Sequence, residues 1–211
     1  MRGRLIAIEG IDGSGKTSQV QLLAGGAERA GTITVTSEPG ATVLGAELRG
    51  LLLNRELPPV TERSEALLMA ADRAQHVAEV VAPALEAGRW VVTDRFSGST
   101  LAYQGYGRGL DLDDLRLLVD WATGGITPDL NVLVDVPVAV GRGRRAGGRE
   151  DRLEGLGDEF QERVRSGYLA LAAADPKHWV VIDGVGEREA VATRLSTAVV
   201  ARLGALPAGA P

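Results

Sequence analysis

The feature that most constrains this chain is a glycine-rich loop held between a short apolar run and a helical pattern. The apolar run is Leu5–Glu9 (LIAIE), the loop covers residues 10–17 (GIDGSGKT), and the helical pattern SQVQLL follows directly. This order of strand, loop and helix is the context that the phosphate-binding motif G-x-x-x-x-G-K-S/T requires. In that context the glycines let backbone N–H groups converge on phosphate oxygens, and the helix start adds its positive end.

The loop predicts binding of ATP together with Mg²⁺. Lys16 is expected to reach the β- and γ-phosphates, and Thr17 to offer its hydroxyl to the metal ion. GTPases and motor ATPases use the same loop, but the chain has no base-reading N-K-x-D sequence and is small for a motor. The residues expected to bind ATP are Gly10, Ile11, Asp12, Gly13, Ser14, Gly15, Lys16 and Thr17.

Five apolar, β-rich runs alternate with helical patterns along the chain. Near-continuous apolar strands that alternate with helices are typical of a parallel sheet whose two faces are both covered. We therefore predict an α/β fold of the P-loop NTPase type, with a parallel five-stranded sheet covered by helices on both faces. The predicted strands are Leu5–Glu9, Ile33–Ser37, Trp90–Asp94, 130–136 and Trp179–Asp183.

The longest predicted helix covers residues 61–87, with Thr61 as its N-cap, Pro83 as a kink and Gly88 as its stop. At 211 residues the chain suits one domain, predicted over 1–203, followed by a disordered tail over 204–211. The arginine- and glycine-rich segment 142–152 is predicted to be a short mobile lid. Further helices are expected over 113–123, 158–174 and 187–202.

Composition and charge narrow the choice of chemistry. The chain has no cysteine and only His76 and His178, which excludes a disulfide framework and a zinc cluster and leaves hard cations such as Mg²⁺. Its net charge of -5 argues against a broad nucleic-acid-binding surface. No apolar run approaches the roughly 20 residues that span a bilayer. We therefore expect a cytoplasmic protein that does not bind a membrane.

An Asp-Arg pair follows the third predicted strand and so lies at the same edge of the sheet as the loop. Asp94 can hold Mg²⁺ through water, and Arg95 can bridge the phosphates as charge spreads during transfer. Other polar groups follow nearby. The Glu38-Pro39-Gly40 turn comes after the second strand, and residues 99–109 offer hydroxyl and amide groups for a polar pocket, whereas a charge at Arg73, in mid-helix, is usually solvated.

Taken together, these motifs resemble the thymidylate kinase family over nearly the whole chain, from about residue 5 to residue 200. The matching segments are EGIDGSGKT, SEPG, LRGLLL, AADRAQ, VTDRF, STLAYQG, GRGLD, PDLNVLVDV and DRLE, in the order that is usual for the family. The resemblance implies a nucleoside monophosphate kinase that transfers phosphate from ATP to dTMP with Mg²⁺, giving dTDP and ADP for dTTP synthesis. It also implies a homodimer packed through helices.

The resemblance also implies roles for individual residues. Asp12 is placed near the acceptor sugar and the path of the phosphoryl group, and Arg95 is expected to hold phosphate. Arg73 is expected to read thymine, and Tyr103 to exclude a 2′-hydroxyl. The acceptor-binding residues implied are Glu38, Arg49, Met69, Arg73, Arg95, Ser99, Thr100, Tyr103 and Gln104.

Family members differ in where they carry a catalytic arginine, which is either in the phosphate loop or in the lid. The loop has none here, so the lid is expected to supply it from Arg142, Arg144, Arg145 or Arg149, of which Arg145 and Arg149 are preferred. The catalytic set is then Lys16, Arg95, Asp12, Arg145 and Arg149.

One departure from the family pattern leaves alternatives open. Met69 stands where an aromatic residue is expected to stack on thymine. A kinase for another nucleotide or a deoxynucleoside therefore remains an alternative, as does a catalytically silent ATP-binding regulator, although intact Lys16, Thr17, Asp94 and Arg95 argue against the latter.

Overall fold

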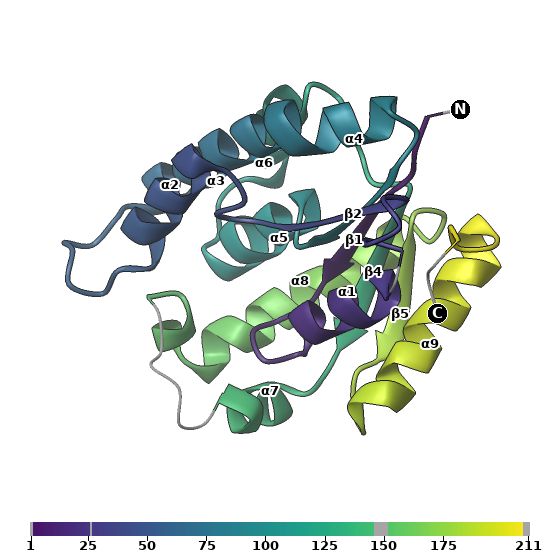
Figure 1. Ribbon diagram of the computed structural model, residues 1–211. Coiled ribbons are helices and arrows are strands. Elements are labelled where there is room, and N and C mark those ends of the chain that lie inside the picture. Colours follow the sequence, from purple (N-terminus) through teal and green to yellow (C-terminus); the bar gives the residue numbers. More distant parts are fainter. Residues whose placement is uncertain (1, 26, 146–151, 209–211) are drawn as a thin grey trace.

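The computed structural model describes residues 2–25, 27–145 and 152–208, and its centre is a parallel five-stranded sheet. The strand order is β2-β3-β1-β4-β5, so the first strand lies in the middle (Figure 1). It pairs with β3 and β4, with Ile8 opposite Asp94 and Glu9 opposite Leu133. The strands are β1 (Leu5–Glu9), β2 (Ile33–Ser37), β3 (Trp90–Asp94), β4 (Leu130–Asp135) and β5 (Trp179–Asp183).

Helices follow each strand in the chain and cover both faces of the sheet. The α-helices are α1 (Lys16–Ala24), α2 (Val43–Leu53), α3 (Glu62–His76), α4 (Ala82–Glu86), α5 (Ser97–Thr100), α6 (Leu112–Thr123), α7 (Val138–Arg145), α8 (Asp158–Ala174) and α9 (Arg188–Leu203). Two π-helical turns, η1 (Val77–Val81) and η2 (Leu101–Gly107), and a 3₁₀ turn, η3 (Glu154–Leu156), complete the set. The predicted fold class is confirmed, and four of the five predicted strands have the observed bounds.

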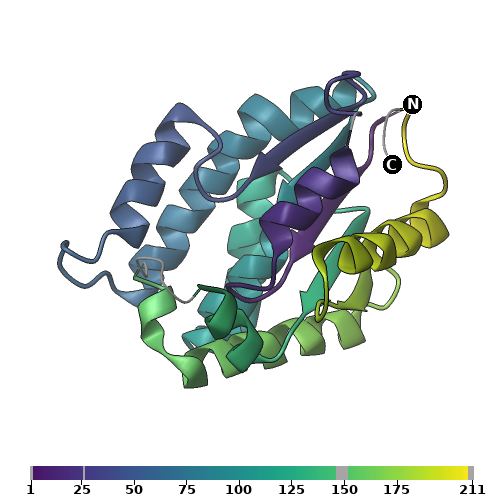
Figure 2. The same ribbon diagram turned by 60° about the horizontal axis from the view of Figure 1, so that its bottom comes forward.

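The two faces of the sheet bury different sets of apolar side chains. Ile6 and Ile8 point to the face that α1 and α9 cover, where they join the cluster containing Val20 and Leu195. Figure 2 shows these two helices on the same side of the sheet. Leu5 points to the opposite face and packs with residues of η1 and α4. Every residue of β1 is buried, which explains why its sequence is nearly continuous in apolar residues.

The segment predicted as one long helix over 61–87 is helical but not regular. Thr61 caps α3 by accepting a hydrogen bond from Ser64 N, and Gly88 follows the last turn with a φ of 77°, as the sequence predicts. Between them, η1 widens the helix directly before the short helix that contains Pro83. Proline has no N–H and crowds the carbonyl four residues earlier, and a π-helical turn takes up that distortion.

The predicted lid differs from expectation at its start. Residues 142–145, expected in a loop, form the last turn of α7. Arginine has a good helix propensity. In addition, Arg144 holds this turn in place through a hydrogen bond of 3.1 Å from Nη1 to the backbone oxygen of Ser14. Residues 146–151, including Arg149, lie outside the described residues.

The segment that follows α9 contacts the rest of the structure. In the closing segment, Leu206 packs against the core beside α9, and the Ala208 carbonyl accepts from Thr32 Oγ1 at 3.0 Å. Among the helices that the structure describes, none is long and apolar enough to cross a membrane.

Candidate active site

The phosphate-binding loop occupies the turn from β1 to α1, under the start of α7. Gly13 has a φ of 78°, and a Cβ atom there would lie 2.2 Å from the Gly141 oxygen. A Cβ on Gly141 would in turn lie 2.6 Å from the Asp12 oxygen. The loop and α7 therefore touch through two glycines, which brings the arginines of α7 next to the loop.

Lys16, the first residue of α1, lies across the loop. Its Nζ donates to the Ile11 oxygen at 2.8 Å and to Ser14 Oγ at 3.4 Å. Burial, together with the cation of Arg95, lowers the pKa of Lys16 to about 8. The ammonium group is thus held against the phosphate-binding loop, where a lysine can reach the β- and γ-phosphates of a bound nucleotide.

The two residues predicted to hold Mg²⁺ are in contact. Thr17 Oγ1 donates to Asp94 Oδ2 at 2.5 Å, which joins the loop to the end of β3. Among the described residues, Asp94 Oδ1 is a buried oxygen that has no hydrogen-bond partner. Hydroxyl and carboxylate oxygens are the ligands that Mg²⁺ prefers, usually together with water and substrate phosphates, so the residues present fit this ion.

Arg95 is the centre of the polar network at the end of β3. Its backbone φ of 70° is left-handed, which turns the chain sharply toward α5. Nη2 pairs with Asp12 Oδ1 and donates to Tyr103 OH at 3.0 Å, while Nη1 donates to the Gly10 oxygen at 3.0 Å. Ser99 Oγ lies 3.3 Å from the same Nη1 atom. One guanidinium thus connects the phosphate loop with the polar helical segment that follows β3.

Asp12 is held in its charged form by these neighbours. Tyr103 OH donates to Asp12 Oδ2 at 2.9 Å, and Gln161 Nε2 donates to the same atom at 3.1 Å. Burial raises the pKa of Asp12, but the cations of Arg95 and Lys16 outweigh burial and place this pKa below its ordinary value. A fixed carboxylate therefore lies between the loop and the pocket described next.

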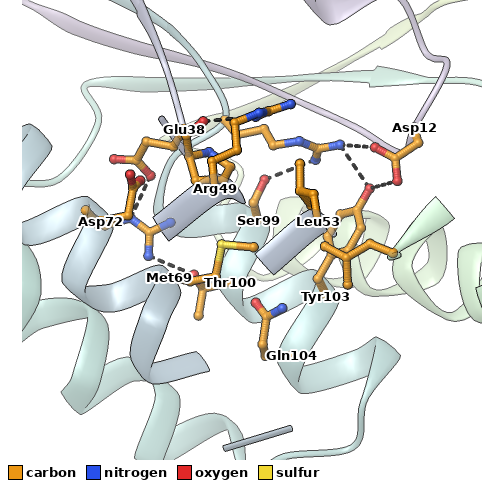
Figure 3. Close-up of a pocket in the computed structure, with 14 residues that line it drawn as sticks. Asp12, Glu38, Arg49, Leu53, Met69, Asp72, Ser99, Thr100, Tyr103 and Gln104 are labelled. Carbon is orange, nitrogen blue, oxygen red and sulfur yellow. Dashed lines mark hydrogen bonds and ion pairs between the residues drawn. The ribbon is translucent and has the colours of Figure 1, made fainter. Parts of the chain in front are cut away.

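A pocket opens beside Arg95 and brings all nine predicted acceptor-binding residues together (Figure 3). Five further residues line it: Asp12, Pro39, Leu53, Asp72 and Leu153. A second cleft runs along the phosphate loop and contains Lys16, Thr17 and Asp94. The pocket and the cleft share Asp12, Glu38, Pro39, Arg49 and Arg95.

Arg73 is buried, although a charge in the middle of a helix is usually solvated. Its Nε donates to Glu38 Oε2 at 2.8 Å, Nη1 to Thr100 Oγ1 at 2.7 Å and Nη2 to the Phe96 oxygen at 3.0 Å. The neighbouring Asp72 is buried as well, and its Oδ1 accepts a hydrogen bond of 2.9 Å from the backbone N–H of Gly40, in the turn after β2. Helix α3 therefore holds the Glu38-Pro39-Gly40 turn, whose Glu38-Pro39 peptide bond is cis.

The remaining predicted residues lie around this centre. Gly10, Ile11 and Ser14 are buried and shape the loop from within. Arg145 ends α7 and lines neither the pocket nor the cleft among the described residues, whereas Arg144 lines the cleft.

The sequence analysis did not single out Glu9, although it is fully buried at the end of β1. It accepts from Ser99 Oγ at 2.6 Å, from Tyr168 OH at 2.9 Å and from Phe96 N at 3.0 Å. Burial raises the pKa of Glu9 above its ordinary value. A lone carboxylate in an otherwise apolar strand is a signal that could have identified it, because buried charges need partners.

Glu65 was missed as well. It lies on α3, four residues before Met69 and eight residues before Arg73, and so on the same face of the helix. That spacing could have identified it, whereas its partners across the pocket are visible only in the structure.

A phosphate loop after the central strand, with a polar pocket adjoining it through shared arginines, defines a P-loop nucleotide kinase. A family model described as thymidylate kinase matches residues 8–195. The chain belongs to the thymidylate kinase family, which phosphorylates dTMP to dTDP using ATP. The family and the enzyme class predicted from the sequence are thus confirmed.

Individual relatives agree over most of their length. The chain is 50% identical over 186 residues to the thymidylate kinase of Carboxydothermus hydrogenoformans, covering 87% of this chain and 90% of the relative. It is 44% identical to the thymidylate kinase of Citrifermentans bemidjiense, and the match covers 98% of this chain and 99% of the relative. The crystal structure of thymidylate kinase from Ehrlichia chaffeensis superposes with a TM-score of 0.77 at 30% identity, covering 94% of this chain and 100% of that one.

Proposed function

We propose that the chain transfers the γ-phosphoryl group of ATP to dTMP, giving ADP and dTDP for dTTP synthesis. The observation that carries this proposal is the junction of the cleft and the pocket at Asp12, Arg49 and Arg95. ATP phosphates bind the loop over residues 10–17, and dTMP occupies the pocket in Figure 3. The reacting groups then meet where the two arginines lie.

In the transfer step, an oxygen of the dTMP phosphate attacks the γ-phosphorus in line. The new P–O bond forms as the bond from the γ-phosphorus to the β,γ-bridging oxygen breaks, and ADP leaves with that oxygen. Lys16 and Arg95 stabilise the negative charge that spreads over the transferred group. Asp12 keeps Arg95 in place through their ion pair. Positioning and charge stabilisation thus supply the catalysis, and no covalent enzyme intermediate is needed.

Mg²⁺ supplies charge neutralisation at the β- and γ-phosphates when it is bound. Thr17 and Asp94 would hold it, the latter partly through water. Helix α7 brings Arg144 to the cleft, and we assign the catalytic arginine of the lid to Arg145 or Arg149, which follow it in the chain.

Different residues recognise the base and the sugar of dTMP. Arg73 and Gln104 face the base, Met69 packs against it, and Tyr103 closes the space where a 2′-hydroxyl would lie. The ring of Tyr103 is fixed because its hydroxyl contacts both Asp12 and Arg95. This constraint favours a deoxyribose.

We also propose a homodimer that packs through α3 and α6. Leu67 on α3 is 59% exposed, and Leu117 and Trp121 on α6 are 72% and 83% exposed. These two helices pack against each other, so their apolar side chains form one surface. A two-fold axis would bury the same surface on both subunits. Light scattering should give a dimer for the wild type and a monomer for Trp121→Glu. The control Val200→Glu changes an exposed side chain of α9, away from this surface, and should remain dimeric.

The experiment that tests the activity measures ADP release with ATP, Mg²⁺ and each nucleoside monophosphate in turn. We expect dTMP to be turned over far faster than dCMP, AMP or GMP, and Lys16→Ala to abolish the reaction. No turnover with dTMP would refute the proposed function and leave the fold unaffected.

A further inference from the structure

Gln104 is bound on one side by an ion pair, between buried Glu65 and half-buried Arg108, that has no part in the transfer step. Gln104 Nε2 donates to Glu65 Oε1 at 3.0 Å. Arg108 donates to the same carboxylate twice, from Nε to Oε1 at 3.1 Å and from Nη2 to Oε2 at 2.7 Å. The exposed fraction is 2% for Glu65 and 1% for Gln104, so water does not compete for these contacts.

The carboxylate determines which way the Gln104 amide faces. An amide carries a donor end and an acceptor end of nearly equal size, but a carboxylate only accepts. If Gln104 turned its oxygen to Glu65, two acceptors would face each other in a buried site, which is unfavourable. The amino end therefore faces Glu65, and the carbonyl oxygen faces away from it.

Arg108 keeps this carboxylate in position. Its guanidinium carbon lies 5.4 Å from the centre of the Phe160 ring, and Phe160 packs edge-on against Tyr103 in the pocket wall. Arg108 follows Gln104 by four residues at the end of η2, so both side chains reach α3 from the same side. The pair is thus fixed at both partners.

Gln104 lines the pocket, below Met69 and Thr100 in Figure 3. We infer that the Glu65–Arg108 ion pair positions the Gln104 carbonyl oxygen toward the base and so makes the pocket select a pyrimidine with an N3–H group. This inference rests on the proposed function. Thymine and uracil carry that hydrogen, whereas cytosine presents a lone pair at N3, which the oxygen would repel. Glu65 and Arg108 are then positioning residues that determine specificity without touching the substrate.

Glu65→Met tests the inference because it removes the acceptor and retains the length of the side chain. The amide of Gln104 is then free to turn, and its amino end can serve cytosine. We expect the ratio of kcat/KM for dTMP to that for dCMP to fall about ten-fold to one-hundred-fold, chiefly through KM. The ratio for dTMP against dUMP should not change, since both bases carry N3–H, and KM for ATP should not change either.

The controls separate selectivity from folding. Glu62→Met, at an exposed carboxylate in the first turn of the same helix, should leave all ratios unchanged. Glu65→Met leaves Arg108 without its carboxylate partner, which could prevent folding. The double variant Glu65→Met/Arg108→Met removes both charges and replaces the single variant in these assays if the latter does not fold. An equal loss for dTMP and dCMP in a folded variant would overturn the inference.

Binding measured by calorimetry without ATP separates this inference from the proposed function. If the wild type bound nucleotides but turned none over, the proposed function would fail. The ratio of the Kd values for dTMP and dCMP, in the wild type and in Glu65→Met, would still decide whether the ion pair sets the base selectivity.

Discussion

Thr17 Oγ1 donates to Asp94 Oδ2 at 2.5 Å and thereby joins the phosphate loop to the end of the neighbouring strand β3. The contact brings together, from residues 77 positions apart in the sequence, the two oxygen-bearing side chains that we propose as ligands of Mg²⁺. Neither residue alone makes a metal site, and among the described residues there is no group of three His, Cys, Asp or Glu side chains that could hold a metal. We therefore propose that phosphate oxygens and water complete the coordination of Mg²⁺.

Asp94→Asn should weaken the use of Mg²⁺, because the amide retains the shape of the side chain but loses its charge. We expect the Mg²⁺ concentration at half-maximal rate to rise about ten-fold to one-hundred-fold, a range typical of changes beside a metal ion. A titration of the rate with Mg²⁺ measures this. Asp183→Asn, at the end of β5, is the matched control, and equal Mg²⁺ dependence in both variants would contradict the metal assignment.

Gly141→Ala should disturb the phosphate loop through contact with the Asp12 oxygen. The added methyl group has no room, and overpacking of this kind lowers the free energy of unfolding by about 1–3 kcal/mol. KM for ATP should rise as the loop shifts. Among the described residues no atom lies within 4 Å of a Cβ added at Gly143, on the same helix, so Gly143→Ala should stabilise the protein by up to about 1 kcal/mol. Urea unfolding and ATP kinetics compare the two, and similar behaviour would refute the close contact.

Lys16 should make ATP use depend on pH in the alkaline range. Its pKa of about 8 in the folded protein means that the ammonium group loses its proton as the pH rises through that value. Because kcat/KM reports the free enzyme, kcat/KM for ATP should fall above about pH 8. At saturating ATP the phosphates favour the charged amine, so kcat should persist to higher pH.

A pH profile of initial rates checks this expectation for Lys16. Replacement of the exposed Lys177 by Ala should leave the profile unchanged. A kcat/KM that stays constant to about pH 10, near the ordinary lysine pKa, would contradict the expectation.

Met69→Phe should tighten binding of dTMP, because an aromatic ring stacks on the base where a thioether only packs. Stacking adds about 0.5 to 1.5 kcal/mol beyond the buried area, which corresponds to a fall in KM for dTMP of about two-fold to ten-fold. KM for ATP should stay the same and serves as the internal control. A rise in KM for dTMP would mean that the pocket has no room for the ring.

Much of this fold could be predicted from the sequence, because its determinants are local. The apolar runs that became β1 and β5 alternate with helical patterns, and the capping residue Thr61 and the stop at Gly88 act within a few residues of themselves. The glycine loop also carries its own context, since the strand before it and the helix after it adjoin it in the chain. Resemblance to a family then placed the acceptor residues in one pocket.

Other features required the tertiary structure, because they depend on partners far apart in the chain. Arg73 looked like a solvated charge until Glu38 and Thr100 were seen to enclose it. The helical start of the predicted lid also has a distant partner, because Arg144 donates a hydrogen bond to the backbone oxygen of Ser14 in the phosphate loop.

The contact between Glu65 and Gln104 shows most clearly what the sequence determines and what the tertiary structure determines. The sequence alone determined that a phosphate loop would lie at the edge of a parallel sheet, because the spacing of its residues contains that information. Only the tertiary structure decided which end of the Gln104 amide faces Glu65, because these two residues are 39 positions apart in the sequence and meet only when the helices pack. A hydrogen bond between elements is a property of their packing, and no local pattern encodes it.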